Sequence, residues 1–143
     1  MPVFPTKILV ASDGSDTGRQ AIAYAGELAA ATRSDLHLVF VGLVSRWTAP
    51  DNLSPAQYKR MKDQSQKRLD DEAAWARKNG VEVAKTHLQM GRIDAEIIRL
   101  SEKLEAGLVV VGSRGMDAIE RILLGNDSES IVRHAHCPVL VVR

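Results

Sequence analysis

The fold class is decided by the stretch Leu108-Val109-Val110-Val111-Gly112-Ser113-Arg114-Gly115. Its first four residues are apolar at every position, which is typical of a strand that is buried on both faces. Strands of this kind occur in parallel sheets that are covered by helices on both sides. The glycines that follow indicate a turn, so the stretch predicts a buried parallel strand that ends in a glycine-rich loop.

Outward from this strand, short apolar runs alternate with helical patterns along the chain. The runs predict four further strands, at residues 7–11, 36–41, 81–88 and 139–142, and the patterns predict helices near residues 16–32, 55–79, 94–105 and 127–135. Five strands separated by four helices require a parallel sheet with right-handed crossovers. The sequence therefore predicts one domain over residues 1–143, a three-layer α/β sandwich of Rossmann-like type with the order βαβαβαβαβ.

Helix ends are marked by their own residues. Ser54-Pro55-Ala56-Gln57 predicts an N-cap, a first-turn proline and a capping box. Gly80 and Gly107 are expected to stop the second and third helices, because glycine adopts the left-handed conformation easily. Asn126 is expected to cap the last helix, with Glu129 reaching back.

Composition excludes several classes of function. Lys and Arg number 19 against 18 Asp and Glu, and a net charge of +1 provides no field that would attract nucleic acid or an anionic membrane. The apolar runs are shorter than the ~20 residues of a membrane-spanning helix. The single cysteine, Cys137, fits a reducing compartment. We therefore expect a cytoplasmic protein without a nucleic-acid partner.

The loop after residue 111 carries the clearest functional pattern. Gly112-Ser113-Arg114-Gly115 is followed by nine residues and then by Gly125-Asn126-Asp127-Ser128 at a predicted helix start. Backbone N–H groups at a glycine turn and at a helix N-terminus can surround a phosphate, and glycines let the anion approach closely. The pattern thus indicates phosphate binding.

These residues resemble the universal stress protein family, whose ATP-binding members show Gly-x2-Gly-x9-Gly followed by Ser or Thr. The resemblance extends over nearly the whole chain. It includes residues 7–15, the Gly91-Arg92-Ile93 turn and the ending from Val132 to Val142. It implies a fold similar to that of adenine nucleotide α hydrolases, ATP, ADP or AMP as ligand, Mg²⁺ with a triphosphate, and a homodimer in which residues 139–142 of two copies pair.

The resemblance also implies a set of nucleotide-binding residues. It places Asp13 beside the ribose, the backbone of Val41 at the adenine edge, and the phosphates near the glycines and the residues that follow them. The full candidate set is Ala11, Asp13, Val41, Met90, Gly112, Arg114, Gly115, Gly125, Asn126, Asp127 and Ser128. Asn126 departs from the family pattern, and the charge of Asp127 repels phosphate unless Mg²⁺ intervenes or the side chain turns away.

Plainer explanations stay open for the same residues. Asn126, Asp127 and Glu129 suit a helix N-terminus without any ligand, and Asp13 suits a turn before Gly14. The protein would then be a dimeric interaction protein of the stress response that binds no nucleotide. The closely spaced His134, His136 and Cys137 do not favour one metal ion, because three ligands so crowded at a helix end seldom converge.

An enzyme is the third alternative. Residues 12–17 resemble in part the pyrophosphate loop of ATP pyrophosphatases, although Asp13 replaces a glycine of that loop. No Walker loop, nucleophile elbow or zinc signature is present in the sequence. We therefore expect at most slow ATP hydrolysis, with no catalytic residues or metal ligands to name and a regulatory protein partner of unknown identity.

Overall fold

The computed structural model describes residues 2–43, 53–113 and 126–143. It confirms the alternation of strands and helices that the sequence predicts. The elements in chain order are β1 (Lys7–Ala11), α1 (Asp16–Thr32), β2 (Asp35–Leu43), α2 (Pro55–Lys78), β3 (Lys85–Gly91), α3 (Ile93–Leu104), β4 (Leu108–Gly112), α4 (Asn126–His134) and β5 (Val139–Val142).

All strands of the sheet run parallel, in the order β3-β2-β1-β4-β5. The first three strands therefore progress towards one edge, and the chain then crosses to the other side of β1 to form β4 and β5. In register, Ile8 lies opposite Leu36 of β2 on one side and opposite Leu108 of β4 on the other. The strand order thus reverses between β1 and β4.

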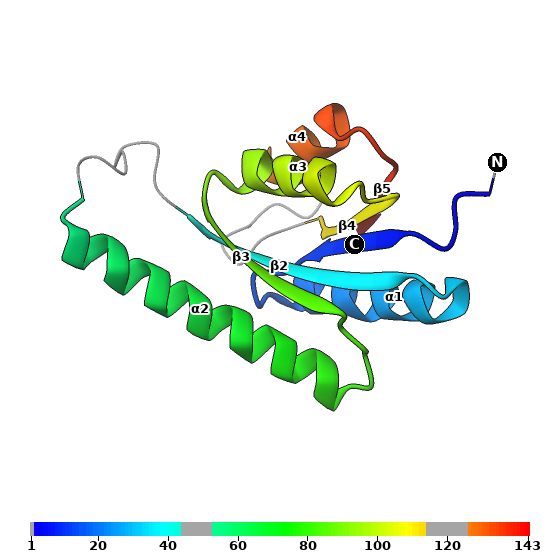
Figure 1. Ribbon diagram of the computed structural model, residues 1–143, viewed down its shortest axis with the longest axis horizontal. Helices are drawn as coiled ribbons and strands as arrows, with labels where there is room; N and C mark the ends of the chain where they lie inside the picture. The colour runs from blue at the N-terminus through cyan, green and yellow to red at the C-terminus, as the bar shows by residue number, and fades with distance from the viewer. Residues whose placement is uncertain (1, 44–52, 114–125) are drawn as a thin grey trace.

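Two apolar cores lie on the two faces of the sheet, because successive strand residues point to opposite sides. Ile8 and Leu38 face α1 and α2, where they pack with Leu69, whereas Leu9 faces the other side and packs with Ile97. Figure 1 shows α1 and α2 below the sheet and α3 and α4 above it. This arrangement is the predicted three-layer sandwich.

Local sequence explains where the first two helices begin and end. Ser15 caps α1 by accepting a hydrogen bond from the backbone N–H of Gly18 at 3.1 Å. The capping box predicted for α2 is present, since Ser54 and Gln57 each accept a hydrogen bond from the other's backbone N–H. Gly80 has a φ of 79°, as expected after a helix that stops at a left-handed residue.

Three predicted boundaries were wrong. Residues 81–84 precede β3 instead of forming it, because the N–H of Val81 bonds to Ala76 at the end of α2. Helix α3 ends at Leu104 instead of Glu105, and the left-handed residue that stops it is Glu105, at a φ of 54°, instead of Gly107. The last helix already begins at Asn126, so Asn126 is its first residue instead of the residue before it.

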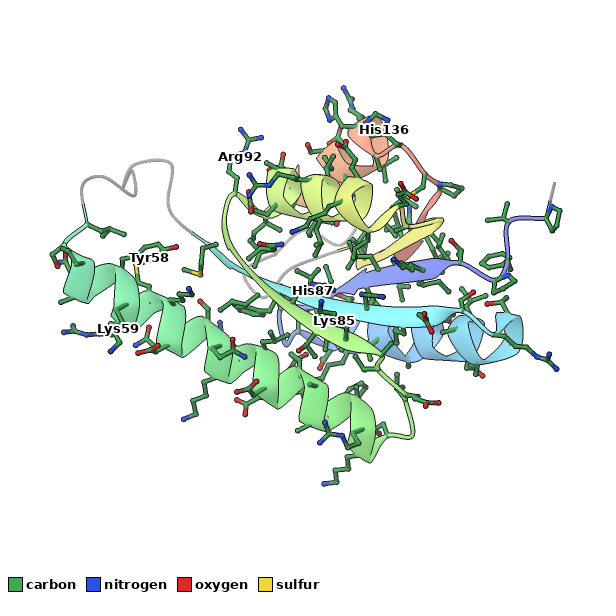
Figure 2. The ribbon with its side chains drawn as sticks, viewed as in Figure 1. Tyr58, Lys59, Lys85, His87, Arg92 and His136 are labelled. Carbon is green, nitrogen blue, oxygen red and sulfur yellow. The ribbon has the colours of Figure 1, made fainter. Side chains whose placement is uncertain are left out.

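A histidine pair joins β2 to β3 on the face covered by α3. Nδ1 of His37 and Nε2 of His87 lie 2.9 Å apart and share a hydrogen bond, and the two rings are stacked. Figure 2 shows the position of His87 on β3. Burial, together with the charges of His37, Lys85 and Lys103, lowers the pKa of His87 to about 4. Burial also lowers the pKa of His37, helped by Lys7. Both rings therefore prefer to stay neutral in the folded protein.

The histidine pair predicts a loss of stability in mild acid. The unfolded chain binds protons near pH 6.5, whereas folded His87 binds one only near pH 4, so the free energy of unfolding falls as the pH drops between these values. We expect a loss of up to about 2 kcal/mol between pH 7 and pH 5 in urea titrations. His87→Gln should show a shallower pH dependence, and an equal slope in both proteins would contradict the prediction.

Candidate functional site

The candidate site lies at the carboxyl ends of β1 and β4, where the strand order reverses. In open parallel sheets, ligands bind at this place because the loops that leave the two strands diverge and create a crevice. Ala11 ends β1, and Gly112 ends the neighbouring β4. The fold thus brings two predicted site segments together, residues 11–15 and the start of the glycine-rich loop.

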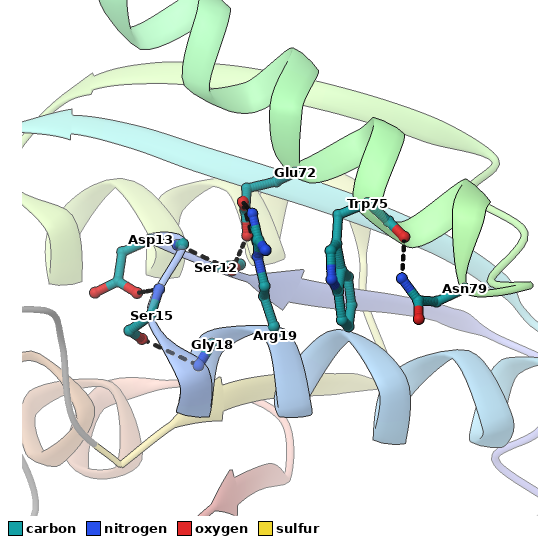
Figure 3. A network of polar contacts seen from close by, with 9 residues as sticks. Ser12, Asp13, Ser15, Gly18, Arg19, Glu72, Trp75 and Asn79 are labelled. Carbon is teal, nitrogen blue, oxygen red and sulfur yellow. Dashed lines mark hydrogen bonds and ion pairs between the residues drawn. The ribbon is translucent and has the colours of Figure 1, made fainter.

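The loop between β1 and α1 is held by its own polar side chains. Oδ1 of Asp13 accepts a hydrogen bond from the backbone N–H of Ser15 at 2.9 Å, which makes Asp13 a turn residue as its plainer interpretation proposes. Gly14 has a φ of 87°, a conformation that favours glycine. The half-buried carboxylate of Asp13 points away from α2 (Figure 3). This hydrogen bond within the turn is compatible with a second role for the Asp13 carboxylate as a ligand-binding group.

Between this loop and α2 lies a buried network that the sequence analysis missed. Glu72 of α2 is 3% exposed, and its Oε1 accepts a hydrogen bond from the hydroxyl of Ser12 at 2.7 Å. Its Oε2 accepts two from Arg19, at 2.9 Å and 3.3 Å, and the Arg19 guanidinium lies 5.3 Å from the ring centroid of Trp75 (Figure 3). The network connects the loop, α1 and α2.

Gly112 is packed tightly at the end of β4. A Cβ atom built on Gly112 would lie 3.0 Å from the backbone carbonyl of Thr17 in the first turn of α1. The hydroxyl of Ser128, in α4, donates a hydrogen bond to the carbonyl oxygen of Gly112 at 2.7 Å. The strand end, the start of α1 and the start of α4 therefore meet at this glycine.

Asp127 is directed towards α3. A backbone hydrogen bond from Asp94 reaches its carboxylate, while burial and the nearby charge of Asp94 raise the pKa of Asp127. Asp94 itself accepts two hydrogen bonds from Arg92 and one from Ser130, so its pKa lies far below the ordinary value. The carboxylate of Asp127 therefore lies next to the first turn of α3.

The remaining candidate residues fall into two groups. Ala11 and Val41 both pack on the core that faces α3 and α4. Met90 lies opposite Gly42 in the sheet and, with Ser65 of α2, borders the space that a side chain at Gly42 would fill, so it lies on the other face. Arg114, Gly115 and Gly125, as well as the side chain of Asn126, lie outside the described residues.

The histidines near the C-terminus have partners of their own. Nδ1 of His134 lies 2.9 Å from the carbonyl oxygen of Ser130, and Nε2 of His136 lies 2.7 Å from Glu102. Among the residues that the structure describes, no group of three His, Cys, Asp or Glu side chains could hold a metal ion. No helix in the described ranges is long and apolar enough to cross a membrane.

The contact at Gly112 predicts the effect of one added methyl group. Gly112→Ala should push the start of α1 away from β4, because the new Cβ would meet the backbone carbonyl of Thr17, which cannot rotate away, as well as the Thr17 hydroxyl. We expect a loss of about 1–3 kcal/mol in the free energy of unfolding, measured by urea denaturation. An unchanged midpoint would show that the strand end and α1 are less tightly packed than the structure has them.

Comparisons with known proteins agree with this architecture. The model of the universal stress protein family matches residues 5–143. A universal stress protein of Methanocaldococcus jannaschii is 32% identical over 143 residues, which span 96% of this chain and 81% of the relative.

Solved structures of universal stress proteins share the fold. One, in complex with cAMP, is 23% identical with a TM-score of 0.72 and covers 99% of both chains. Another, from Archaeoglobus fulgidus in complex with dAMP, is 20% identical with a TM-score of 0.66 and covers 98% of this chain and 99% of its own. From the family model and the sequence identity over nearly its full length, the chain belongs to the universal stress protein family.

Proposed function

We propose that this protein binds an adenine nucleotide, ATP, ADP or AMP, at the carboxyl ends of β1 and β4, and that it acts in the stress response by binding and dimerisation instead of turnover. One observation carries the proposal: the Asp13 turn, Gly112 and the first turn of α4 meet where the strand order reverses. Support also comes from the relatives, since universal stress proteins of the same fold were solved with cAMP and with dAMP.

Each part of the nucleotide has a matching group in this arrangement. The carboxylate of Asp13 can accept hydrogen bonds from ribose hydroxyls, and the backbone of Val41 can meet the adenine edge. Ala11 lies on the same face of the sheet as Val41, whereas Met90 could reach the adenine only from the opposite face. The phosphates belong at Gly112 and the N-terminus of α4, where the helix dipole favours an anion. Arg114, Gly115, Gly125, Asn126 and Ser128 complete the proposed phosphate site.

In this proposal the carboxylate of Asp127 does not repel the phosphates strongly enough to prevent binding. Its carboxylate accepts a backbone hydrogen bond from Asp94 and so lies towards α3. The hydroxyl of Ser128 donates to Gly112, yet its oxygen can still accept a hydrogen bond. A triphosphate would bring Mg²⁺ with it, which neutralises part of its charge.

Nucleotide binding is tested by thermal unfolding with AMP, ADP, cAMP and Mg·ATP. A ligand present at about 100 times its Kd stabilises the protein by about 2.7 kcal/mol, which raises the Tm by roughly 5–10 °C for a domain of this size. Asp13→Asn keeps the oxygen that accepts from Ser15 but removes the charge, so it should lower the affinity about tenfold. Asp35→Asn, exposed at the opposite end of the sheet, should leave the affinity unchanged.

The outcome separates the three functions considered from the sequence. No rise in Tm with any of the four nucleotides would contradict nucleotide binding and favour a dimeric interaction protein. Rapid release of pyrophosphate in the presence of an acceptor would instead favour an enzyme. A rise in Tm with little phosphate release would support the regulatory role.

The homodimer belongs to the same proposal and is supported by the outer edge of β5. Within the described sheet, β5 has a hydrogen-bonded neighbour only in β4. The carbonyl groups of Pro138 and Val142 accept hydrogen bonds from β4, so the backbone groups of Val139 and Val141 point outwards. Val132 of α4, the helix that precedes this strand, is 45% exposed. An unpaired apolar edge of this kind favours a second strand.

Two proline variants test the dimer in a matched way. Val141→Pro removes an outward N–H that the partner strand would need, and edge positions tolerate proline, so we expect a folded monomer by light scattering after gel filtration. Leu140→Pro removes an inward hydrogen bond to β4 and should destabilise the fold itself. A Val141→Pro protein that stays dimeric would exclude pairing through β5.

A further inference from the structure

Glu72 is an unusual residue for the middle of a mostly exposed helix. The buried residues of α2 are Ser65, Leu69, Glu72 and Ala76, and the first ten residues of the helix contain none that is buried. The side chain of Glu72 is 4% exposed, and Arg19 neutralises its charge. A buried carboxylate is costly unless it is paired and hydrogen-bonded, so its position is tied closely to its partners.

The partners of Glu72 lie in the loop that carries Asp13. The hydroxyl of Ser12 donates to Glu72 and accepts a hydrogen bond from the backbone N–H of Gly14 at 3.3 Å. A Cβ atom on Gly14 would lie 3.6 Å from Oε2 of Glu72, so the carboxylate lies directly beneath the turn. Asp13 lies between these two anchored residues and points to the other side of the loop (Figure 3).

We infer that Glu72 is a positioning residue for the proposed nucleotide site. Through Ser12 and Gly14 it fixes the turn so that the carboxylate of Asp13 faces the ribose, and it thereby couples occupancy of the site to α2. The inference rests on the proposed function, because it assigns a specificity role and a means of regulation to that same site.

The coupling follows from the small number of buried contacts that α2 makes. If a nucleotide stabilises the Asp13 turn, it also stabilises the hydrogen bond from Ser12 to Glu72, which lies between Leu69 and Ala76 on the buried face of the helix. Linkage between two sites is reciprocal, so a change at α2 must alter nucleotide affinity by the same factor.

Ribose specificity is the readout that separates positioning from a purely structural ion pair. We expect AMP to bind the unchanged protein about tenfold or more tightly than 2′,3′-dideoxy-AMP in calorimetry, because Asp13 loses its hydroxyl partners in the analogue. In Ser12→Ala and Glu72→Gln this ratio should fall to about threefold or less. Asp70→Asn, an exposed carboxylate of the same helix that accepts only from Gln66 in the described contacts, is the control and should keep the ratio.

Hydrogen exchange tests the coupling independently of affinity. Saturating AMP should slow amide exchange at residues 65–76 of the unchanged protein, and this protection should be absent in saturated Ser12→Ala. Ser12→Ala removes one hydroxyl and leaves the ion pair of Glu72 and Arg19 in place. The inference can therefore be tested with Ser12→Ala alone if Glu72→Gln does not fold.

The failures can be told apart. If none of AMP, ADP, cAMP and Mg·ATP binds to the unchanged protein, the proposed function is overturned, and the inference with it. If another of these nucleotides binds but AMP does not, the ribose test is made with that nucleotide and its analogue without ribose hydroxyls. If the ratio of the affinities for AMP and 2′,3′-dideoxy-AMP is the same in the unchanged protein and in both variants, only the inference is overturned. The inference is also overturned if the unchanged protein binds the two ligands equally well. Protection of α2 that persists in Ser12→Ala also overturns it, since the network would then only hold two helices together.

Discussion

Parallel hydrogen bonding between β1 and β4 is the constraint on which the rest of the structure depends. It places the strand that starts the fold beside a strand formed about a hundred residues later, with Leu9 opposite Val109. Both strands are buried on both faces, so their registry is fixed by the two cores as well as by the backbone. This pairing brings the loop after Ala11 next to Gly112, and without it the candidate site would be two unrelated turns.

Much of this fold could be predicted because its determinants are local. Residues 7–11 and 139–142 are apolar runs bounded by turn residues, and Ser54 and Gln57 form a capping box within one helical turn. The third strand was predicted to begin at residue 81, four residues too early. The apolar residues Val81 and Val83 pack on the core, but the hydrogen bonding of β3 to β2 begins only at Lys85. Its later residues, including Lys85, are polar, as an edge strand allows.

The candidate site could be predicted only where a short motif marks it. Asp13 follows β1, Gly112 ends β4, and Ser128 lies in the first turn of α4. The structure brings these three residues to the same end of the sheet. Glu72 could not be found in this way, because Ser12 lies 60 residues before it and the run Asp70-Asp71-Glu72 is indistinguishable from a solvated helix face. The pair His37 and His87 spans 50 residues and was missed for the same reason.

The two edge strands of the sheet, β3 and β5, differ in chemistry, and this difference limits how many copies of the chain could join edge to edge. The β3 margin presents Lys85, His87 and Gln89, whereas the β5 margin is entirely aliphatic. In the proposed dimer, two copies use the same β5 surface, and the outer edges of the joined sheet would be the two β3 strands, which carry the charge of Lys85. Such a dimer would be complete at two subunits, because a charged edge strand disfavours the pairing of a further copy.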